Sequence, residues 1–332
     1  MVLTQRSNVR RPTLEDVARW SGVSKSTVSR VVNGESKVSP EVAVRVREAI
    51  SALGYVPNQA ARQLVTRRTG AVAVVAAQPE DRLFLDPFFD CLLRGIRGEL
   101  ARHGTQAVLL FVDEPDDYAR VADYLGGGHV DGAILFSLRP VFGGRPLLCD
   151  GDPVRGQAYV DGDNRGGAQL AVRHLLALGR ERVATVTGPY DQENSAAERL
   201  AGYRDVLPDT APHLVERADY TRQGGADAMA ALLDRHPGLD AVFVASDLMA
   251  SGALQTLRER GRRVPQDVAV VGFDDLVSIS ESTDPPLTTV HQDVAEMGRL
   301  LARLLFDRTE QGPGQDLPSA IVPTRLVVRQ SA

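Results

Sequence analysis

One short segment near the N-terminus carries side chains that could read DNA. Between Ser24 and Asn33, the apolar residues Val28, Val31 and Val32 recur at helical spacing and predict one buried face. The opposite face carries only hydrogen-bonding side chains, none of them acidic: Lys25, Ser26, Thr27, Ser29 and Arg30. A helix fits the major groove, where such side chains meet base edges and phosphates, so this face is typical of a DNA-reading helix. The alternative is an ordinary solvated helix face.

Polar side chains at the ends of apolar runs indicate a second kind of site. Asp274 ends one such run, Ser246 ends another, and Arg199 opens an expected helix after a Gly-Pro loop. Because a carboxylate and a guanidinium can each form paired hydrogen bonds, together they suit the neighbouring hydroxyls of a sugar. We therefore expect a small-molecule site at these strand ends.

The sequence contains no motif for catalysis, cofactor binding or metal binding. Glycine-rich phosphate loops, the nucleophile elbow and the zinc-protease motif are all missing from it. Cys91 and Cys149 are expected to be two reduced thiols. The six histidines lack metal-ligand spacing, and they are His103, His129, His174, His213, His236 and His291. We expect no enzyme, no cofactor and no metal; a solute-binding protein and a sugar-processing enzyme are the alternatives.

Three helices are expected to position the DNA-reading face. Thr13 and Asp16 match a capping box that starts the first helix, and Gly22 ends it. Pro40 starts a third helix, which stops at Gly54. Two short helices joined around a glycine, with a third in support, form the helix-turn-helix layout.

The remainder of the chain alternates apolar runs with amphipathic stretches. The expected strands are 71–77, 107–112, 132–136, 182–187, 241–245 and 268–272. The expected helices are 88–104, 116–126, 164–179, 195–207, 224–235, 247–260 and 293–306. This alternation predicts parallel sheets with crossover helices, and its break near 160–164 predicts two similar lobes. The fold class is a small all-α head plus an α/β body of two doubly wound lobes, as in periplasmic binding proteins.

Charge is divided unevenly along the 332 residues. Residues 1–69 hold 12 Lys and Arg against 5 Asp and Glu, whereas the whole chain has a net charge of −5. A basic head on an acidic body indicates that only the head binds a polyanion. The sequence shows neither a signal-peptide core nor an apolar run long enough to span a membrane, so we expect a cytoplasmic protein.

Several segments together resemble the lactose/galactose repressor (LacI/GalR) family of transcription regulators. They are 13–17, 22–24, 27–33 and 53–58 in the head, with further matches along the body. The resemblance implies that Lys25, Ser26 and Arg30 read bases. It also implies that residues 58–69 form a hinge helix on DNA, where Leu64 wedges a base step and Ala61 permits close approach. The full DNA-binding set is Thr13, Ser24, Lys25, Ser26, Thr27, Ser29, Arg30, Asn33, Tyr55, Asn58, Ala61 and Leu64.

The same resemblance implies the effector-binding residues. Arg199 and Asp274 match the arginine and aspartate that bind the effector in the family. The further candidates are Phe88, Asp150, Ser246 and Gln292. From the residues alone, Phe88 could be a core side chain, Asp247 a helix cap and Asp275 a structural group.

The expected organisation follows from these assignments. We expect residues 1–57 to bind DNA and residues 58–69 to link them to the body. The body, residues 70–332, is expected to bind the effector and to dimerise. Within the body, lobe one is 70–160 with 292–319, and lobe two is 161–289 with 320–332. We expect a repressor that binds a palindromic operator as a homodimer and is controlled allosterically by a mono- or disaccharide; the alternative effector is a purine.

Overall fold

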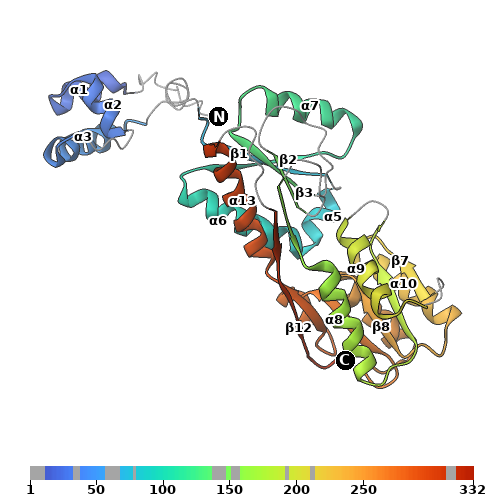
Figure 1. The fold of residues 1–332 in the computed structure, drawn as a ribbon. Coiled ribbons are helices and arrows are strands. Elements are labelled where there is room, and N and C mark those ends of the chain that lie inside the picture. Colours follow the sequence, from blue (N-terminus) through green and yellow to red (C-terminus); the bar gives the residue numbers. More distant parts are fainter. Residues whose placement is uncertain are drawn as a thin grey trace, which may run out of the picture. The chain divides into compact units, whose positions relative to one another are not determined.

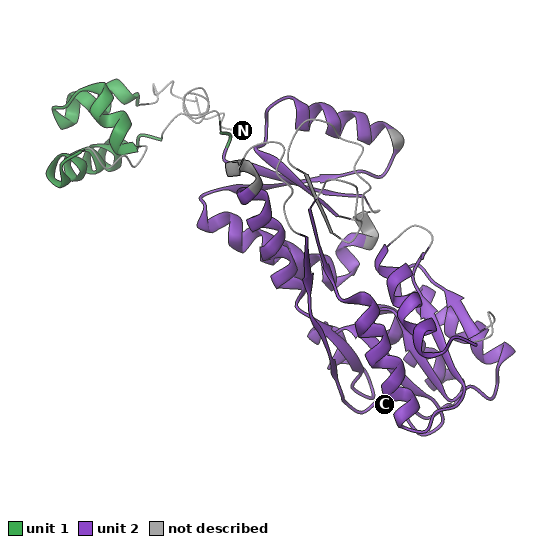
Figure 2. Cartoon of the chain, viewed as in Figure 1, with its two compact units in different colours: residues 1–69 green, residues 70–332 purple. Residues whose placement is uncertain are grey.

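The structure is a computed structural model that describes residues 12–32, 38–56, 68–77, 80–136, 147–150, 158–190, 194–209, 214–311 and 319–332. The chain divides into two compact units, residues 1–69 and 70–332 (Figure 2). Asn33, Asn58, Ala61 and Leu64 lie outside the described residues, as does the side chain of Asp150.

The first unit is a three-helix head. Its helices are α1 (Leu14–Ser21), α2 (Lys25–Val32) and α3 (Pro40–Leu53). Thr13 and Asp16 form the expected capping box. Gly22 ends α1 with φ +67°, a left-handed conformation that costs glycine least, so the chain turns at once into α2. Val17, Val28 and Val46, one from each helix, form the core that fixes their packing.

The second unit contains two six-stranded sheets (Figure 1), whose strands follow corresponding orders and differ in the direction of one edge strand. The first sheet has the order β11-β5-β4-β3-β1-β2, and all of its pairs are parallel. Its strands are β1 (Ala71–Ala76), β2 (Gln106–Phe111), β3 (Gly132–Phe136), β4 (Leu147–Asp150), β5 (Tyr159–Gly162) and β11 (Ala320–Val322). Its helices are α5 (Glu80–Leu85), α6 (Pro87–Arg102), α7 (Pro115–Gly126) and α13 (Val294–Gln311).

The second sheet has the order β12-β10-β9-β8-β6-β7. Its strands are β6 (Val183–Thr187), β7 (Val215–Arg217), β8 (Ala241–Val244), β9 (Ala269–Asp274), β10 (Thr288–Gln292) and β12 (Thr324–Val327). Its helices are α8 (Asn164–Ala177), α9 (Asn194–Val206), α10 (Arg222–Arg235), α11 (Asp247–Glu259) and α12 (Val277–Ser280). Only β12 is antiparallel to its neighbour, β10. The predicted fold class, a helical head with a two-lobed α/β body, is confirmed.

Each sheet packs between helices, as continuous apolar strands require. On one face of the first sheet, Leu92 and Ile96 of α6 pack with Met297 and Leu301 of α13. In the second sheet, Phe243 and Phe273 lie in the core against α8. Because parallel strands end at the same edge of a sheet, this packing holds the polar residues that follow β6, β8 and β9 close together.

The chain passes between the two sheets at three points, after Gly162, Gln292 and Val322. The third crossing differs from the expectation that residues 320–332 all belong to lobe two. Ala320–Val322 pairs with β5 in the first sheet, and only the residues after Pro323 reach the second. Proline lacks the N–H that a strand ladder uses, so Pro323 breaks the pairing between β11 and β12.

The C-terminal residues are held inside the second sheet. The hydroxyl of Ser331, which is fully buried, donates to the Val270 carbonyl at 2.6 Å and accepts from the Thr288 N–H at 2.8 Å. The backbone N–H of Val270 in turn donates to the Ser331 carbonyl at 2.8 Å. Ser331 therefore ties β9 and β10 to the end of the chain.

Candidate functional site

The candidate DNA-reading face lies on α2. Ser24 begins this helix, because its hydroxyl accepts from the Thr27 N–H at 3.1 Å, and it lies 2.8 Å from the hydroxyls of Ser26 and Thr27. Val28 is buried, whereas Lys25 and Arg30 are exposed. The helix therefore presents hydroxyls and cations on the side away from the core, as a major-groove reader does.

Lys25 already has a partner within the head. Its amine donates to a carboxylate oxygen of Glu15 at 2.8 Å, and both side chains are almost two-thirds exposed. The Lys25 hydrogen bond and charge lower the pKa of Glu15. This contact uses one of the three N–H donors of the Lys25 ammonium, so Glu15 competes with DNA for its charge.

We expect Glu15→Gln to strengthen DNA binding about two- to five-fold, because it releases Lys25 and removes a charge that repels phosphates. Fluorescence anisotropy with operator and random duplexes, at two salt concentrations, measures this. Glu41→Gln, an equal charge change at an exposed position on α3, is the matched control. A weaker complex in the Glu15→Gln variant would show that the ion pair orients Lys25 for binding.

Two other predicted DNA contacts have structural roles in the head. The Thr13 hydroxyl donates to Asp16 at 2.8 Å as part of the capping box. Tyr55 is only 8% exposed and packs into the core of the head. Its contribution to DNA binding stays a prediction, as do those of Asn33, Asn58, Ala61 and Leu64, which lie outside the described residues.

In the body, a buried guanidinium lies at the centre of the candidate effector site. Arg199, on α9, donates through Nε to Oδ1 of Asn164 at 2.8 Å and through Nη1 to the Ala245 carbonyl. Its Nη2 lies 3.4 Å from the Asp274 carboxylate. The guanidinium also stacks over the Phe273 ring, 3.8 Å from its centroid. These four contacts hold the Arg199 side chain in one orientation.

Asp274 and Gln292 complete this cluster. The Gln292 amide donates to Oδ1 of Asp274 at 2.7 Å. Burial raises the pKa of the Asp274 carboxyl to about 7; the Arg199 charge lowers it and the Asp86 carboxylate raises it further. Asp274 has φ +107°, a strained conformation for a residue other than glycine, and such strain is common at binding sites. The structure thus brings Arg199, Asp274 and Gln292 together.

Ser246 and its neighbour Asp247 have structural roles. Ser246 caps α11, because its hydroxyl accepts from the Met249 N–H at 3.2 Å. The carboxylate of Asp247 is fully buried and accepts from the Thr289 hydroxyl at 2.6 Å and the Leu276 N–H at 2.8 Å. The cap at this helix is therefore Ser246 rather than Asp247. Burial, with the Asp274 charge second, raises the pKa of Asp247 well above its ordinary value.

Asp275 joins the last segment of the chain to the site. It accepts from Arg329 at 2.7 Å and from the Ser280 hydroxyl at 3.2 Å, and its second oxygen lies 3.0 Å from Nδ1 of His291. These contacts support the structural interpretation of Asp275.

Phe88 packs within the first lobe. Its ring stacks on Phe136 with 6.1 Å between centroids, and it contacts the core of the first sheet while staying half-buried. Phe89 is almost fully buried and also contacts Phe136. The Phe88 ring can therefore offer a ligand one face at most.

Three further polar residues of the site were not singled out from the sequence. Asp161 and Asn164 flank the first crossing, and Thr187 ends β6; all three are buried. Nδ2 of Asn164, Oε1 of Gln292 and Oγ1 of Thr187 form no hydrogen bond within the described part of the protein. Buried polar atoms normally have partners, so these three indicate a polar ligand. The available signal was the run of polar residues and glycine at 161–164, where the alternating pattern breaks.

A cavity of about 650 Å³ adjoins this cluster. Asp274 and Gln292 line it from the second sheet and the crossing, and Asp86, Phe84 and Pro87 line it from the first lobe. Its size lies within the ordinary range for small-molecule sites. Both lobes thus contribute to one cavity beside the Arg199 cluster.

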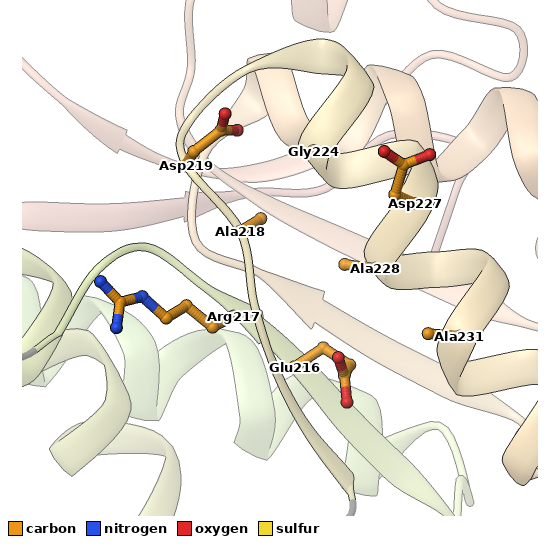
Figure 3. Close-up of a pocket in the computed structure, with 8 residues that line it drawn as sticks. All are labelled: Glu216, Arg217, Ala218, Asp219, Gly224, Asp227, Ala228 and Ala231. Atoms are coloured by element: carbon orange, nitrogen blue, oxygen red, sulfur yellow. The ribbon is translucent and has the colours of Figure 1, made fainter.

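A second, more open groove of about 470 Å³ lies between β7 and α10 (Figure 3). Its acidic residues already have partners: Glu216 pairs with Arg235, Asp219 accepts from Thr221, and Asp227 accepts from Gln223. None of the predicted effector residues lines it. This groove is therefore separate from the candidate effector site.

No helix among the described residues is long and apolar enough to cross a membrane. Within the same residues, no group of three or more His, Cys, Asp or Glu could hold a metal ion.

A helix-turn-helix head attached to a two-lobed ligand-binding body defines a class of protein, the ligand-responsive DNA-binding transcription regulators. Comparison with known proteins places the chain within that class. Residues 13–58 match the model of bacterial regulatory proteins of the lacI family, and residues 172–332 match a periplasmic binding protein-like domain. The chain belongs to the LacI family of transcription regulators, which are not enzymes.

Individual relatives agree over nearly the full length. The HTH-type transcriptional regulator CelR of Thermobifida fusca is 45% identical, over 97% of this chain and 98% of its own. The structure of a CelR–cellobiose complex is 41% identical with a TM-score of 0.75, over 97% of this chain and 100% of that one. The structure of a Lac repressor dimer bound to operator and the anti-inducer ONPF is 28% identical with a TM-score of 0.83, over 97% of this chain and 99% of that one.

Proposed function

We propose that this protein is a repressor that binds a palindromic operator as a homodimer and changes its operator affinity when an uncharged mono- or disaccharide binds in the body. The Arg199–Asp274–Gln292 cluster carries the proposal, because it places a guanidinium and a carboxylate in contact beside a cavity. The solved relatives support it: one is described with cellobiose, and another as a dimer on operator DNA.

The charges around the site favour a neutral effector. Asp161 and Asp274 are buried near Arg199, the one arginine among the described residues that is buried, and the buried Asp247 lies close to Asp274. A phosphate group would have to approach these carboxylates, and phosphate sites normally offer an excess of cations. A sugar needs acceptors for its hydroxyl hydrogens, which carboxylates supply.

The packing of the phenylalanines gives the purine alternative less support. A purine would need Phe88 and Phe89 as an aromatic pair, but both rings pack against Phe136. A sugar needs only one apolar face, which the exposed Phe84 offers in the cavity lining, whereas Phe88 does not line the cavity.

Titration calorimetry tests the effector, with cellobiose, ribose, glucose 6-phosphate and adenine as probes. We expect a sugar to bind and to change operator affinity. Asp274→Asn should lower the sugar affinity by ~10- to 100-fold, because an amide replaces a charged acceptor, while operator binding stays nearly unchanged. Asp209→Asn, the same chemical change at an exposed position that does not line the cavity, is the matched control. Tight binding of adenine or the phosphate with no binding of either sugar would contradict the proposal.

A further inference from the structure

Asp161 is a buried carboxylate for which the cluster above has no role. It lies near the end of β5 and is 7% exposed. One of its oxygens accepts from the Gly162 N–H at 2.7 Å. In the first sheet it is paired with Ile321 of β11, so it belongs to the first lobe.

The residues after Asp161 contact the Arg199 cluster directly. A Cβ on Gly162 would lie 2.1 Å from Oε1 of Gln292, so the backbone there packs closely against that amide. Oδ1 of Asn164 accepts from Arg199. Burial raises the pKa of Asp161, while the Gly162 N–H, the nearby side-chain amide of Asn164 and the Arg199 charge lower it. Asp161 thus lies within the electrostatic reach of the same guanidinium as Asp274.

The open hydrogen-bonding positions around Asp161 indicate which group is missing. Within the part of the chain that the structure describes, Nδ2 of Asn164, which lies close to Asp161, makes no full hydrogen bond, and Oε1 of Gln292 accepts none. Asn164 is 3% exposed and Gln292 2% exposed. A hydroxyl is the simplest group that accepts from an amide and donates to a carboxylate at once. An effector hydroxyl that reaches both side chains would therefore accept from Nδ2 of Asn164 and donate to the Asp161 carboxylate.

We propose that Asp161 contacts the effector, accepting a hydrogen bond from one effector hydroxyl on the first-lobe side of the site. This inference rests on the proposed sugar-binding function and adds a specificity-determining residue to it. Asp161 and Asp274 come from different sheets, so the sugar is held by one carboxylate from each lobe. A sugar that lacks this hydroxyl leaves a buried carboxylate unpaired and is rejected.

The test compares Asp161→Asn with the wild type, using cellobiose as the probe in titration calorimetry. An asparagine keeps the acceptor for the Gly162 N–H, so the turn and the melting temperature should be retained. We expect the affinity for cellobiose to fall by ~10- to 100-fold, with unchanged operator affinity. Asp163→Asn is the matched control, since Asp163 is exposed, caps α8 and tolerates asparagine as a cap.

Monodeoxy analogues of cellobiose identify the hydroxyl. The wild type should bind one of them ~10-fold or more weakly than cellobiose, and Asp161→Asn should bind that analogue and cellobiose nearly equally. If the wild type and Asp161→Asn bound cellobiose with equal affinity, the assignment of Asp161 would be overturned and the proposed function would stand. Failure of every sugar to bind the wild type would overturn the proposed function and this assignment with it.

Discussion

Arg199→Met should abolish the effector response and destabilise the body by about 3–5 kcal/mol at neutral pH. The substitution keeps an apolar side chain of similar length but removes the guanidinium, which stacks over Phe273 and faces Asp274, Asn164 and the Ala245 carbonyl. Asp274 is then left buried without its cation, which is the costly way to break a buried ion pair. Thermal and denaturant unfolding measure the loss of stability, and calorimetry with cellobiose measures the loss of binding.

The loss of stability should depend on pH with a defined sign. The folded pKa of Asp274, about 7, is already above the ordinary value of 3.8, so the folded state binds the proton more tightly than the unfolded state. The Asp274 carboxyl therefore makes its full contribution to the free energy of unfolding below pH 4, where it is protonated in both states. This contribution is lost as the pH rises through the folded pKa. Without Arg199 the folded pKa rises further, so the variant should lose more stability than the wild type between pH 5 and pH 8.

A second substitution separates charge from packing. Arg199→Met combined with Asp274→Asn removes the uncompensated carboxylate, so it should recover much of the stability and flatten the pH dependence, but it should not bind sugar. If the free energy of unfolding of Arg199→Met differed from that of the wild type by the same amount at pH 5 and at pH 8, the electrostatic account of this site would be wrong.

Ser331→Ala should destabilise the second lobe by about 2–4 kcal/mol, a large effect for the loss of one hydroxyl. The hydroxyl satisfies both the Val270 carbonyl and the Thr288 N–H in a fully buried position, and alanine leaves both groups without it. Denaturant unfolding measures the change in stability.

The neighbouring position provides the control for Ser331. Gln330 is exposed, so Gln330→Ala should change the free energy of unfolding by less than about 0.5 kcal/mol. Hydrogen exchange at the Thr288 amide should accelerate in Ser331→Ala and not in Gln330→Ala. Equal stabilities of the two variants would show that water replaces the serine hydroxyl at little cost.

Much of the fold follows from the apolar pattern, because the long buried strands and amphipathic helices have strong periodicity. The run 132–136 was expected as a strand and is β3, and the helix expected to begin at 247 is α11. The pattern did not identify β4, β5, β7, β10, β11 and β12 as strands. Except for β10, which has five residues, these are strands of three or four residues, too short for an alternation to be distinguished from a loop. Their positions depend on pairing with distant strands.

The sequence predicted those residues of the candidate site whose place in a motif already indicates a ligand contact. The positions of Arg199 and Asp274 within their motifs indicated that they face the same ligand, and the structure brings them into contact. Asp161 and Asn164 were read as the break between lobes, because polar residues between a strand and a helix normally form a turn. Their burial depends on how three crossings meet, and a local sequence pattern does not contain that information.

The order in which the chain is made gives the third crossing a further consequence. Residues 320–327 supply an edge strand to each sheet, and Ser331 then ties β9 to β10. During synthesis these residues leave the ribosome after every other strand and helix of the body. Neither lobe can therefore complete its sheet until these residues have emerged, whereas the three helices of the head have emerged long before. A polypeptide broken off before residue 320 should leave the ribosome with a formed reading head and no finished body, a product for proteases to remove.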